Sequence, residues 1–412
     1  MGHELLQFEA VDEAIDGLCD GAFAFLERLV AAPSCVGDEC EAQAVVADEL
    51  DRLGFDLSQV SLAALDEPAA GIPVHILEDR AVVVGRRSGS GRSLVINGHI
   101  DVVPPGAQEL WSSPPFEPTR TADGWLQGRG AGDMKGGFAM ATLALEALLA
   151  TCSEALVGPV TFVSVIEEEC TGNGTLSSAR AGVVGDAVLL PEPTDLGLLL
   201  GGIGILWVEI TVYGQPAHAA SAGEGVNAID AALPALAALR TLEAELRACS
   251  GGERCTVNVG TFRAGDWQSS VPAASRLGVR IGFPPSWTAV QALEFSSEVL
   301  ERETAADPWL STHPPRILPN GLRAEGYDVA PSAAVALLAA AHREVVGTEP
   351  SIVPVAATTD ARFYANQFGR PAMCYGPRAR NIHGIDEAVE LASIVEGARV
   401  LARFIVSWVG SS

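Results

Sequence analysis

Short β-rich apolar runs alternate along this chain with longer segments whose apolar residues recur at helical spacing, and this alternation restricts the fold more than any other feature. Helical spacing covers residues 10–31, 39–53, 136–150 and 387–408. The β-rich runs are residues 81–85, 93–97, 159–166, 186–190, 352–356 and 371–375. This order predicts an α/β fold in which a central mixed sheet has helices on both faces.

The order of predicted helices and strands changes between residues 206 and 320. The expected order is a strand (206–213), a helix (226–248), two strands (255–262 and 276–283) and a helix (287–304). These elements make a self-contained β-α-β-β-α unit, and the proline-rich segment after it is expected to return the chain to the first domain. We therefore expect a main domain of residues 1–205 and 321–412, into which a smaller α+β domain of residues 206–320 is inserted.

Composition narrows the class of protein further. A chain of 412 residues with 48% hydrophobic content is globular rather than disordered or fibrous. Its formal charge of −26 repels phosphate backbones and acidic membranes, so we expect neither nucleic acid nor membrane as a partner. The eight cysteines are scattered, and no basic region followed by an apolar run begins the chain, so we expect the cytoplasm.

Two polar residues follow the strand at 93–97, in the sequence G-H-I-D-V-V-P. Side chains at the carboxyl end of such a strand point into a crevice, and alternation places His99 and Asp101 on the same side. A zinc-bound imidazole usually donates its other N–H to a carboxylate, which Asp101 could supply. For an H-x-D pair on its own, a histidine that is merely hydrogen-bonded near a turn is the alternative.

Acidic residues lie in comparable places further along the chain. Asp133 lies in the glycine-dense sequence G-R-G-A-G-D-M-K-G-G, where an acidic residue argues against the alternative of a phosphate-binding loop. Glu167, Glu168 and Glu169 end an apolar strand. Adjacent carboxylates repel one another, which suits a cation site or catalysis, although a solvated strand end is an equal alternative.

Two more residues complete the candidate site. Glu192 lies between two prolines after the strand at 186–190, and His383 lies between the last predicted strand and the final helix. Two imidazoles and three carboxylates form a nitrogen and oxygen donor set that suits two zinc ions, with cobalt or manganese as substitutes. The predicted ligands are His99, Asp133, Glu169, Glu192 and His383.

With these motifs in this order, the chain resembles the M20 family of metallopeptidases and deacylases over nearly its whole length. The shared patterns are G-H-x-D-V-V-P, G-x-G-x-x-D-M-K-G-G, a strand ending in acidic residues, P-E-P-T and a late H-x-x-D-E. The resemblance implies a zinc-exopeptidase-like catalytic domain in which Asp133 bridges two metals, one bound by His99 and the other by His383. Glu169 and Glu192 then bind one metal each.

The sequence allows two assignments of the catalytic base that differ by one residue, because the family usually shows D-E-E where this chain shows E-E-E. Spacing to Gly174 makes Glu168 the base and Glu169 the ligand, which is the alternative that we prefer. A count to the N-G-T sequence that follows makes Glu167 the base and Glu168 the ligand.

The inserted domain also carries family motifs. His218, in G-Q-P-A-H-A-A-S, resembles the family histidine that helps to polarise the scissile carbonyl, often across a dimer interface. Arg280 resembles an arginine that meets a substrate carboxylate, although Gly278 occupies the place of the family's acid and Ser270 that of its asparagine. The T-D-A-R segment that lines the family's site corresponds to Thr359 and Asp360.

The resemblance therefore implies an amide hydrolase of the aminoacylase, acetylornithine deacetylase and succinyl-diaminopimelate desuccinylase kind. It would act on a small N-acyl amino acid or dipeptide-like substrate, as a homodimer formed through an inserted domain that serves as a lid or dimerisation domain. A metal-activated water attacks the amide, Glu168 takes its proton, and His218 stabilises the oxyanion. A dipeptidase or carboxypeptidase, a deacylase of a specialised N-acyl intermediate, and a non-catalytic binding homologue remain alternatives.

Overall fold

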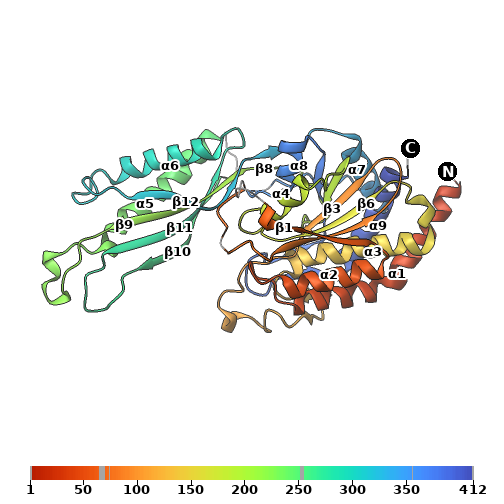
Figure 1. Ribbon diagram of the computed structural model, residues 1–412, viewed down its shortest axis with the longest axis horizontal. Helices are drawn as coiled ribbons and strands as arrows, with labels where there is room; N and C mark the ends of the chain where they lie inside the picture. The colour runs from red at the N-terminus through yellow and green to blue at the C-terminus, as the bar shows by residue number, and fades with distance from the viewer. Residues whose placement is uncertain (1, 65–69, 74, 251–254, 355, 411–412) are drawn as a thin grey trace.

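The computed structural model describes residues 2–64, 70–73, 75–250, 255–354 and 356–410, and it has two parts that lie end to end (Figure 1). The larger part is an α/β domain around a six-stranded mixed sheet, as the alternation predicts. In spatial order its strands are β1 (Asp56–Ser61), β2 (Ala81–Arg87), β6 (Val160–Val165), β3 (Leu94–His99), β7 (Ala187–Leu190) and β14 (Ala372–Cys374). The strands from β6 to β14 run parallel, whereas β1 and β2 are antiparallel to their neighbours.

Helices cover both faces of this sheet. They are α1 (Gly2–Ala31), α2 (Cys40–Arg52), α3 (Gly136–Thr151), α4 (Asn173–Arg180), α7 (Ala333–Val346), α8 (Ala361–Phe368) and α9 (Leu391–Val409). A Cβ on Gly98 of β3 would lie 2.6 Å from the Phe138 ring, so one face of β3 meets α3. The preceding residue, Asn97, points to the opposite face of the sheet. Its side-chain amide donates to the hydroxyls of Thr175 of α4 at 3.0 Å and Tyr364 of α8 at 2.9 Å.

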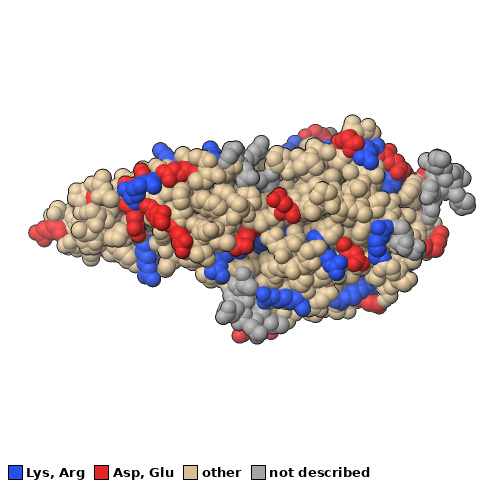
Figure 2. All heavy atoms as spheres, turned by 90° about the horizontal axis from the view of Figure 1, so that it is seen from above, with Lys and Arg blue, Asp and Glu red and all other residues tan. Residues whose placement is uncertain are grey.

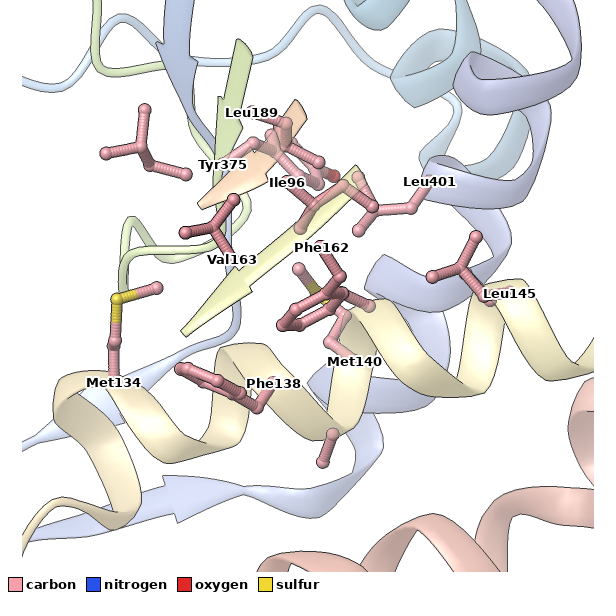
Figure 3. Packing of buried hydrophobic residues seen from close by; sticks show 14 of the residues in the cluster. Ile96, Met134, Phe138, Met140, Leu145, Phe162, Val163, Leu189, Tyr375 and Leu401 are labelled. Carbon is pink, nitrogen blue, oxygen red and sulfur yellow. The ribbon is translucent and has the colours of Figure 1, made fainter. Parts of the chain in front are cut away.

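The core between the sheet and α3 is dense and apolar (Figure 3). Phe138 and Met140 of α3 lie beside Phe162 of β6, and the centroids of the two phenylalanine rings are 5.5 Å apart. Close packing also sets the position of the loop after β7. A Cβ on Gly137 would lie 1.9 Å from the carbonyl oxygen of Pro191, so only glycine lets this loop rest on the start of α3.

The smaller part is the inserted domain, an antiparallel sheet with two helices on one face (Figure 1). In spatial order its strands are β10 (Val257–Ala264), β11 (Ala274–Phe283), β9 (Gly204–Tyr213) and β12 (Arg316–Ala324), and its helices are α5 (Ala228–Cys249) and α6 (Ala289–Thr304). Leu206, Val208 and Ile210 of β9 join these helices in a core of their own. Alternation places Ile205 and Trp207 on the opposite face, in a separate small cluster.

Two smaller sheets complete the larger domain. They consist of β15 (Ala379–Arg380), β16 (Ala388–Glu390), β5 (Trp125–Gln127) and β4 (Thr119–Arg120) in one sheet, and β13 (Tyr327–Asp328) with β8 (Gly201–Gly202) in the other. Ala388 of β16 pairs with Gln127 of β5. This pairing brings the loop at 381–387 beside the glycine-rich loop at 128–135, although the two are far apart in the sequence.

The proline-rich return segment ends differently from the prediction, because its last residues form β12. Pro319 is tolerated there since β12 is an edge strand, and the pairing register with β9 shifts between Pro319 and Arg323. The predicted domain division at residue 320 falls inside this strand.

Two further sequence predictions need correction. The last helix begins at Leu391 and not at residue 387, because residues 388–390 pair with β5 as β16. The predicted strand at 352–356 is wrong for the residues that are described: Ile352 forms a single bridge with Leu198 and no strand follows. Val355 lies outside the described residues.

The surface carries its charges in a scattered pattern. On the face shown in Figure 2, acidic and basic side chains are interspersed over both domains. None of the helices in the described part of the chain is both long enough and apolar enough to cross a membrane.

Candidate active site

The last residue of β3, His99, faces a cluster of carboxylates. β3 is buried along its whole length between β6 and β7, so the side chain at its carboxyl end is held firmly at the edge of the sheet. The Nε2 atom of His99 lies 3.1 Å from Oδ1 of Asp133 and 3.8 Å from Oε2 of Glu192. Its Nδ1 atom lies 2.9 Å from the backbone oxygen of Asp101, and donation there leaves Nε2 free to bind a cation.

Asp101 therefore orients His99 through its backbone and not, as predicted, through its carboxylate. The Oδ1 atom of Asp101 is 3.9 Å from Nδ1 of His99, which is too long for a hydrogen bond. The carboxylate instead accepts the backbone N–H groups of Glu168 at 3.3 Å and Glu169 at 3.0 Å. Burial raises the pKa of Asp101 to about 8. Asp101 thus fixes the turn that follows β6.

Asp133 lies between two imidazoles. Its Oδ1 atom faces His99, and its Oδ2 atom lies 3.3 Å from Nε2 of His383. The loop that carries it is held by Glu387, whose carboxylate accepts three backbone N–H groups of this loop, including that of Asp133 at 2.9 Å. Arg129 forms a buried ion pair with the same carboxylate. Asp133 is therefore placed to be shared by two cations.

The second imidazole, that of His383, has its own carboxylate partner. Its Nε2 atom lies 3.2 Å from Oε2 of Glu169. Candidate ligand atoms within 4.8 Å of one another form two groups, one of His99, Asp133 and Glu192 and one of Asp133, Glu169 and His383. Each group has one imidazole and two carboxylates, and the two groups share Asp133. The structure thus brings together all five ligands predicted from the sequence.

The electrostatics of these residues suit bound cations. Burial raises the pKa of Glu192 to about 8, and the nearby carboxylate of Asp133 adds to the rise. Burial also raises the pKa of Asp133, but hydrogen bonds with the two histidines outweigh this effect and the net pKa is lowered. The Oε1 atom of Glu169 is buried without a hydrogen-bond partner. Divalent cations would neutralise the crowded carboxylates and satisfy this oxygen, and imidazole with carboxylate donors fits zinc.

The three adjacent glutamates lie in three different environments. Glu169 belongs to the second ligand group, whereas Glu168 lines the cavity beside both groups without joining either. Burial raises the pKa of Glu168 well above its usual range, and neighbouring carboxylates add to this. Glu167 is fully buried, pairs with Arg80 and accepts a hydrogen bond from Thr171 Oγ1 at 2.7 Å. This arrangement favours Glu168 as the base and Glu169 as the ligand.

The ligand groups open into a cavity of about 550 Å³ that both domains line. Thr359 and Arg280 lie in its wall, as predicted for residues that contact substrate. The guanidinium of Arg280 donates from Nη1 to Oγ1 of Thr256 at 3.0 Å and from Nη2 to the carbonyl of Ala356 at 2.8 Å. Trp207 lies in the same wall.

Two predicted residues lie outside this wall. Asp360 is 1% exposed, its Oδ1 atom is 3.2 Å from Nη1 of Arg362, and it is not among the residues that line the cavity. His218 is exposed on the inserted domain, where its Nδ1 atom accepts the backbone N–H of Ala220 at 3.0 Å and its backbone bridges to Ser270. The structure of this single chain does not bring His218 to the metal ligands.

Three residues that support or line the site were missed at the sequence level. Glu387 completes the H-x-x-D-E sequence, so its place in that motif was a usable signal. Arg80 and Trp207 carry no local signal, because their roles depend on partners far along the chain. Lys135 is the only lysine of the chain, and its Nζ atom ties the loop to α1 by donating to the carbonyl of Leu29 at 2.7 Å.

Two candidate cation sites share a carboxylate at the carboxyl edge of the α/β sheet, and a further glutamate lies beside them. This arrangement is suited to metal-dependent hydrolysis. The chain belongs to peptidase family M20/M25/M40, whose family model matches residues 95–407.

Similar proteins agree with this membership. The chain is 31% identical to a succinyl-diaminopimelate desuccinylase of Methylorubrum extorquens over 90% of this chain and 94% of that protein. It is 28% identical to an N-formyl-4-amino-5-aminomethyl-2-methylpyrimidine deformylase of Halalkalibacterium halodurans over 93% of each protein. Among solved structures, the dipeptidase Dug1p of Saccharomyces cerevisiae has a TM-score of 0.80 at 16% identity, over 98% of this chain and 99% of that one, which shows a shared fold.

Proposed function

We propose that this chain is a cytoplasmic di-zinc amidohydrolase that removes an N-acyl group from a small amino-acid-like substrate. The observation that carries this proposal is the pair of ligand groups that share Asp133, with Glu168 beside them in a cavity that Arg280 also lines. Both relatives described above are named for the removal of an acyl group, which supports deacylation. The donor set favours zinc, with cobalt or manganese as substitutes.

In this proposal each residue has a separate task. Two zinc ions, when bound, lower the pKa of a water molecule and polarise the acyl carbonyl of the substrate. Glu168 takes the proton of the attacking water and passes it to the leaving amine. Arg280 binds a carboxylate of the substrate by charge-assisted hydrogen bonds, and Thr359 offers a hydroxyl in the same wall. Asp101 keeps His99 and the turn of Glu168 in position.

The task of His218 requires a second copy of the chain or a movement of the inserted domain. We assign it to the stabilisation of the oxyanion. Its exposure on the inserted domain supports this, because its side chain is free to reach another molecule. The edge strand β10 is mostly exposed along its length and offers a surface for a homodimer through this domain.

The experiment that tests the proposal combines metal content with turnover. Purified protein is assayed with N-acetyl amino acids and with dipeptides, before chelation, after chelation and after zinc is restored. We expect two zinc ions per chain and release of acetate that stops on chelation and returns with zinc. Cleavage of the dipeptides alone would instead identify a peptidase, and an absence of both zinc binding and turnover would identify a binding protein without catalysis.

A single substitution tests the base. Glu168→Gln keeps the size of the side chain and removes its ability to accept a proton. We expect turnover to fall by about 10²–10⁴-fold while the zinc content stays at two. Full zinc content with near-normal turnover would exclude Glu168 as the base.

A further inference from the structure

The part of the cavity wall that the inserted domain supplies is built from the open face of its sheet. Ile205, Trp207, Arg280 and Leu322 line the cavity there. Leu206 lies between the first two in the sequence and belongs to the core beneath α5 and α6. The period of two along a strand therefore aims Trp207 away from the helices and into the cavity.

Trp207 and Arg280 form one unit of this wall. They are directly opposite each other in the antiparallel register of β9 and β11, so their side chains stand next to each other on one face. The contacts of Arg280 are with neutral oxygens, those of Thr256 and Ala356, and none of the ion pairs among the described residues includes it. Its charge is thus available to a ligand that lies beside the indole.

The indole of Trp207 is held in place from behind. Gly321 of β12 has a φ of +114°, and a Cβ there would lie 2.7 Å from Cε3 of Trp207. A side chain at 321 would therefore be strained and would also displace the ring. Trp207 packs against the small cluster that contains Ile205 and Leu322. One side of the indole rests on the chain and the remainder borders the cavity, as a fixed apolar surface.

We propose that Trp207 is a specificity-determining residue that selects substrates in which an aromatic or large apolar side chain stands beside a carboxylate. The inference rests on the proposed function, in which Arg280 takes that carboxylate. Because the two residues are cross-strand neighbours, the groups that they bind lie on adjacent atoms of the ligand, as in the amine half of an N-acyl aromatic α-amino acid. A charged substrate side chain beside Trp207 would lose its hydration without gaining a hydrogen-bond or ionic partner from the indole.

Binding of compounds that have no amide bond tests this inference independently of catalysis. Dissociation constants of 3-phenylpropanoate, propanoate and 3-phenylpropanamide are measured by ligand-observed NMR titration on the zinc-loaded full chain. We expect 3-phenylpropanoate to bind at least about tenfold more tightly than each of the other two. Trp207→Ala should remove the advantage over propanoate, Trp207→Phe should restore most of it, and Arg280→Met should remove the advantage over the amide.

A matched control uses another tryptophan of the inserted domain. Trp287 packs edge-on against Phe295 on the side of the helices, so Trp287→Ala removes an indole without touching the cavity. This variant should keep the preference for 3-phenylpropanoate. Equal binding of 3-phenylpropanoate and propanoate by the unmodified chain, or a preference that survives Trp207→Ala, would overturn the inference.

Turnover measurements then show whether the amine half or the acyl half of the substrate carries the aromatic ring that Trp207 contacts. The value of kcat/KM for N-acetyl-L-phenylalanine should exceed that for N-acetyl-L-alanine by about tenfold, and Trp207→Ala should abolish the difference. If Trp207→Ala instead affected only N-phenylacetylglycine, the ring would belong to the acyl half and the assignment to the amine half would be overturned. A chain without zinc-dependent turnover would contradict the proposed function, whereas the binding series would still decide the role of Trp207.

Discussion

The carboxylate of Glu387 accepts the backbone N–H of Asp133 at 2.9 Å, across 254 residues of sequence. The same carboxylate holds two further N–H groups of the glycine-rich loop and pairs with Arg129. Because His383 lies only four residues before Glu387, this contact links the loop that carries Asp133 to the loop that carries His383. Both residues belong to the same candidate ligand group. A residue outside both candidate ligand groups thus positions the carboxylate that the two groups share.

Glu387→Gln should weaken metal binding while leaving the fold intact. The glutamine amide would direct its own N–H₂ group at a backbone N–H, so the loop that carries Asp133 would lose part of its support. We expect the affinity for zinc to fall by about 10–100-fold, as measured by competition with a chelator of known affinity. Glu390→Gln is the matched control, because Glu390 pairs with Arg378 and should leave the affinity unchanged. An unaltered affinity in Glu387→Gln would show that the loop needs no such support.

Glu167→Gln should reduce stability rather than chemistry. Glu167 and Glu39 both pair with the buried guanidinium of Arg80, so neutralising one of them leaves that charge partly uncompensated. We expect the free energy of unfolding, from urea titration, to fall by about 1–3 kcal/mol. The turnover of zinc-loaded protein should stay close to normal, in contrast to Glu168→Gln. The opposite result, with stability kept and turnover lost, would move the base to Glu167.

His218→Ala should lower turnover without changing zinc content or thermal stability, because the side chain is exposed and its one described hydrogen bond is to Ala220. Mixing His218→Ala with Glu168→Gln then reveals where the histidine acts. If it acts across a dimer, each mixed dimer contains one complete site, and re-associated protein should recover about a quarter of normal turnover. If it acts within one chain after closure of the inserted domain, mixing will recover nothing.

His342 should make the fold less stable as the pH falls below neutrality. It is 4% exposed, its Nδ1 atom lies 2.9 Å from the hydroxyl of Tyr375, and burial lowers its pKa below the usual 6.5. The folded chain therefore binds fewer protons than the unfolded chain just below pH 6.5, and stability is lost as the pH falls through this range. In urea unfolding at pH 7.5 and 5.5, His342→Gln should lose less stability than the unmodified chain does. An equal loss in both proteins would assign the effect to other groups.

Several site residues could be predicted because each carries a signal in its own neighbourhood. His99, Glu169 and Glu192 directly follow or end apolar runs, and those runs form β3, β6 and β7, three parallel neighbours. Parallel neighbours end at the same edge of a sheet, so polar residues at their carboxyl ends converge without further information. Asp133 could be predicted because it lies in a glycine-rich sequence, G-R-G-A-G-D-M-K-G-G.

Other predictions failed where pairing between distant segments overrode local preference. Residues 388–390 have the apolar spacing of a helix, but the partner strand β5 draws them into a sheet as β16. Pro319 predicts an irregular segment, but it lies within the strand β12. Proline has no backbone N–H to donate, and it is tolerated there because β12 is an edge strand of its sheet.

By itself, the sequence determined the α/β class, the presence of an inserted unit and five candidate ligands, because periodicity and strand-end acids are local properties. Only the tertiary structure decided which two of the three adjacent glutamates line the cavity, since Glu167 is buried and paired with Arg80 whereas Glu168 and Glu169 lie in the cavity wall. It also decided that Glu387 supports Asp133 and that Trp207 stands beside Arg280. These relationships depend on strand register and on side chains that folding alone brings within hydrogen-bond or packing distance.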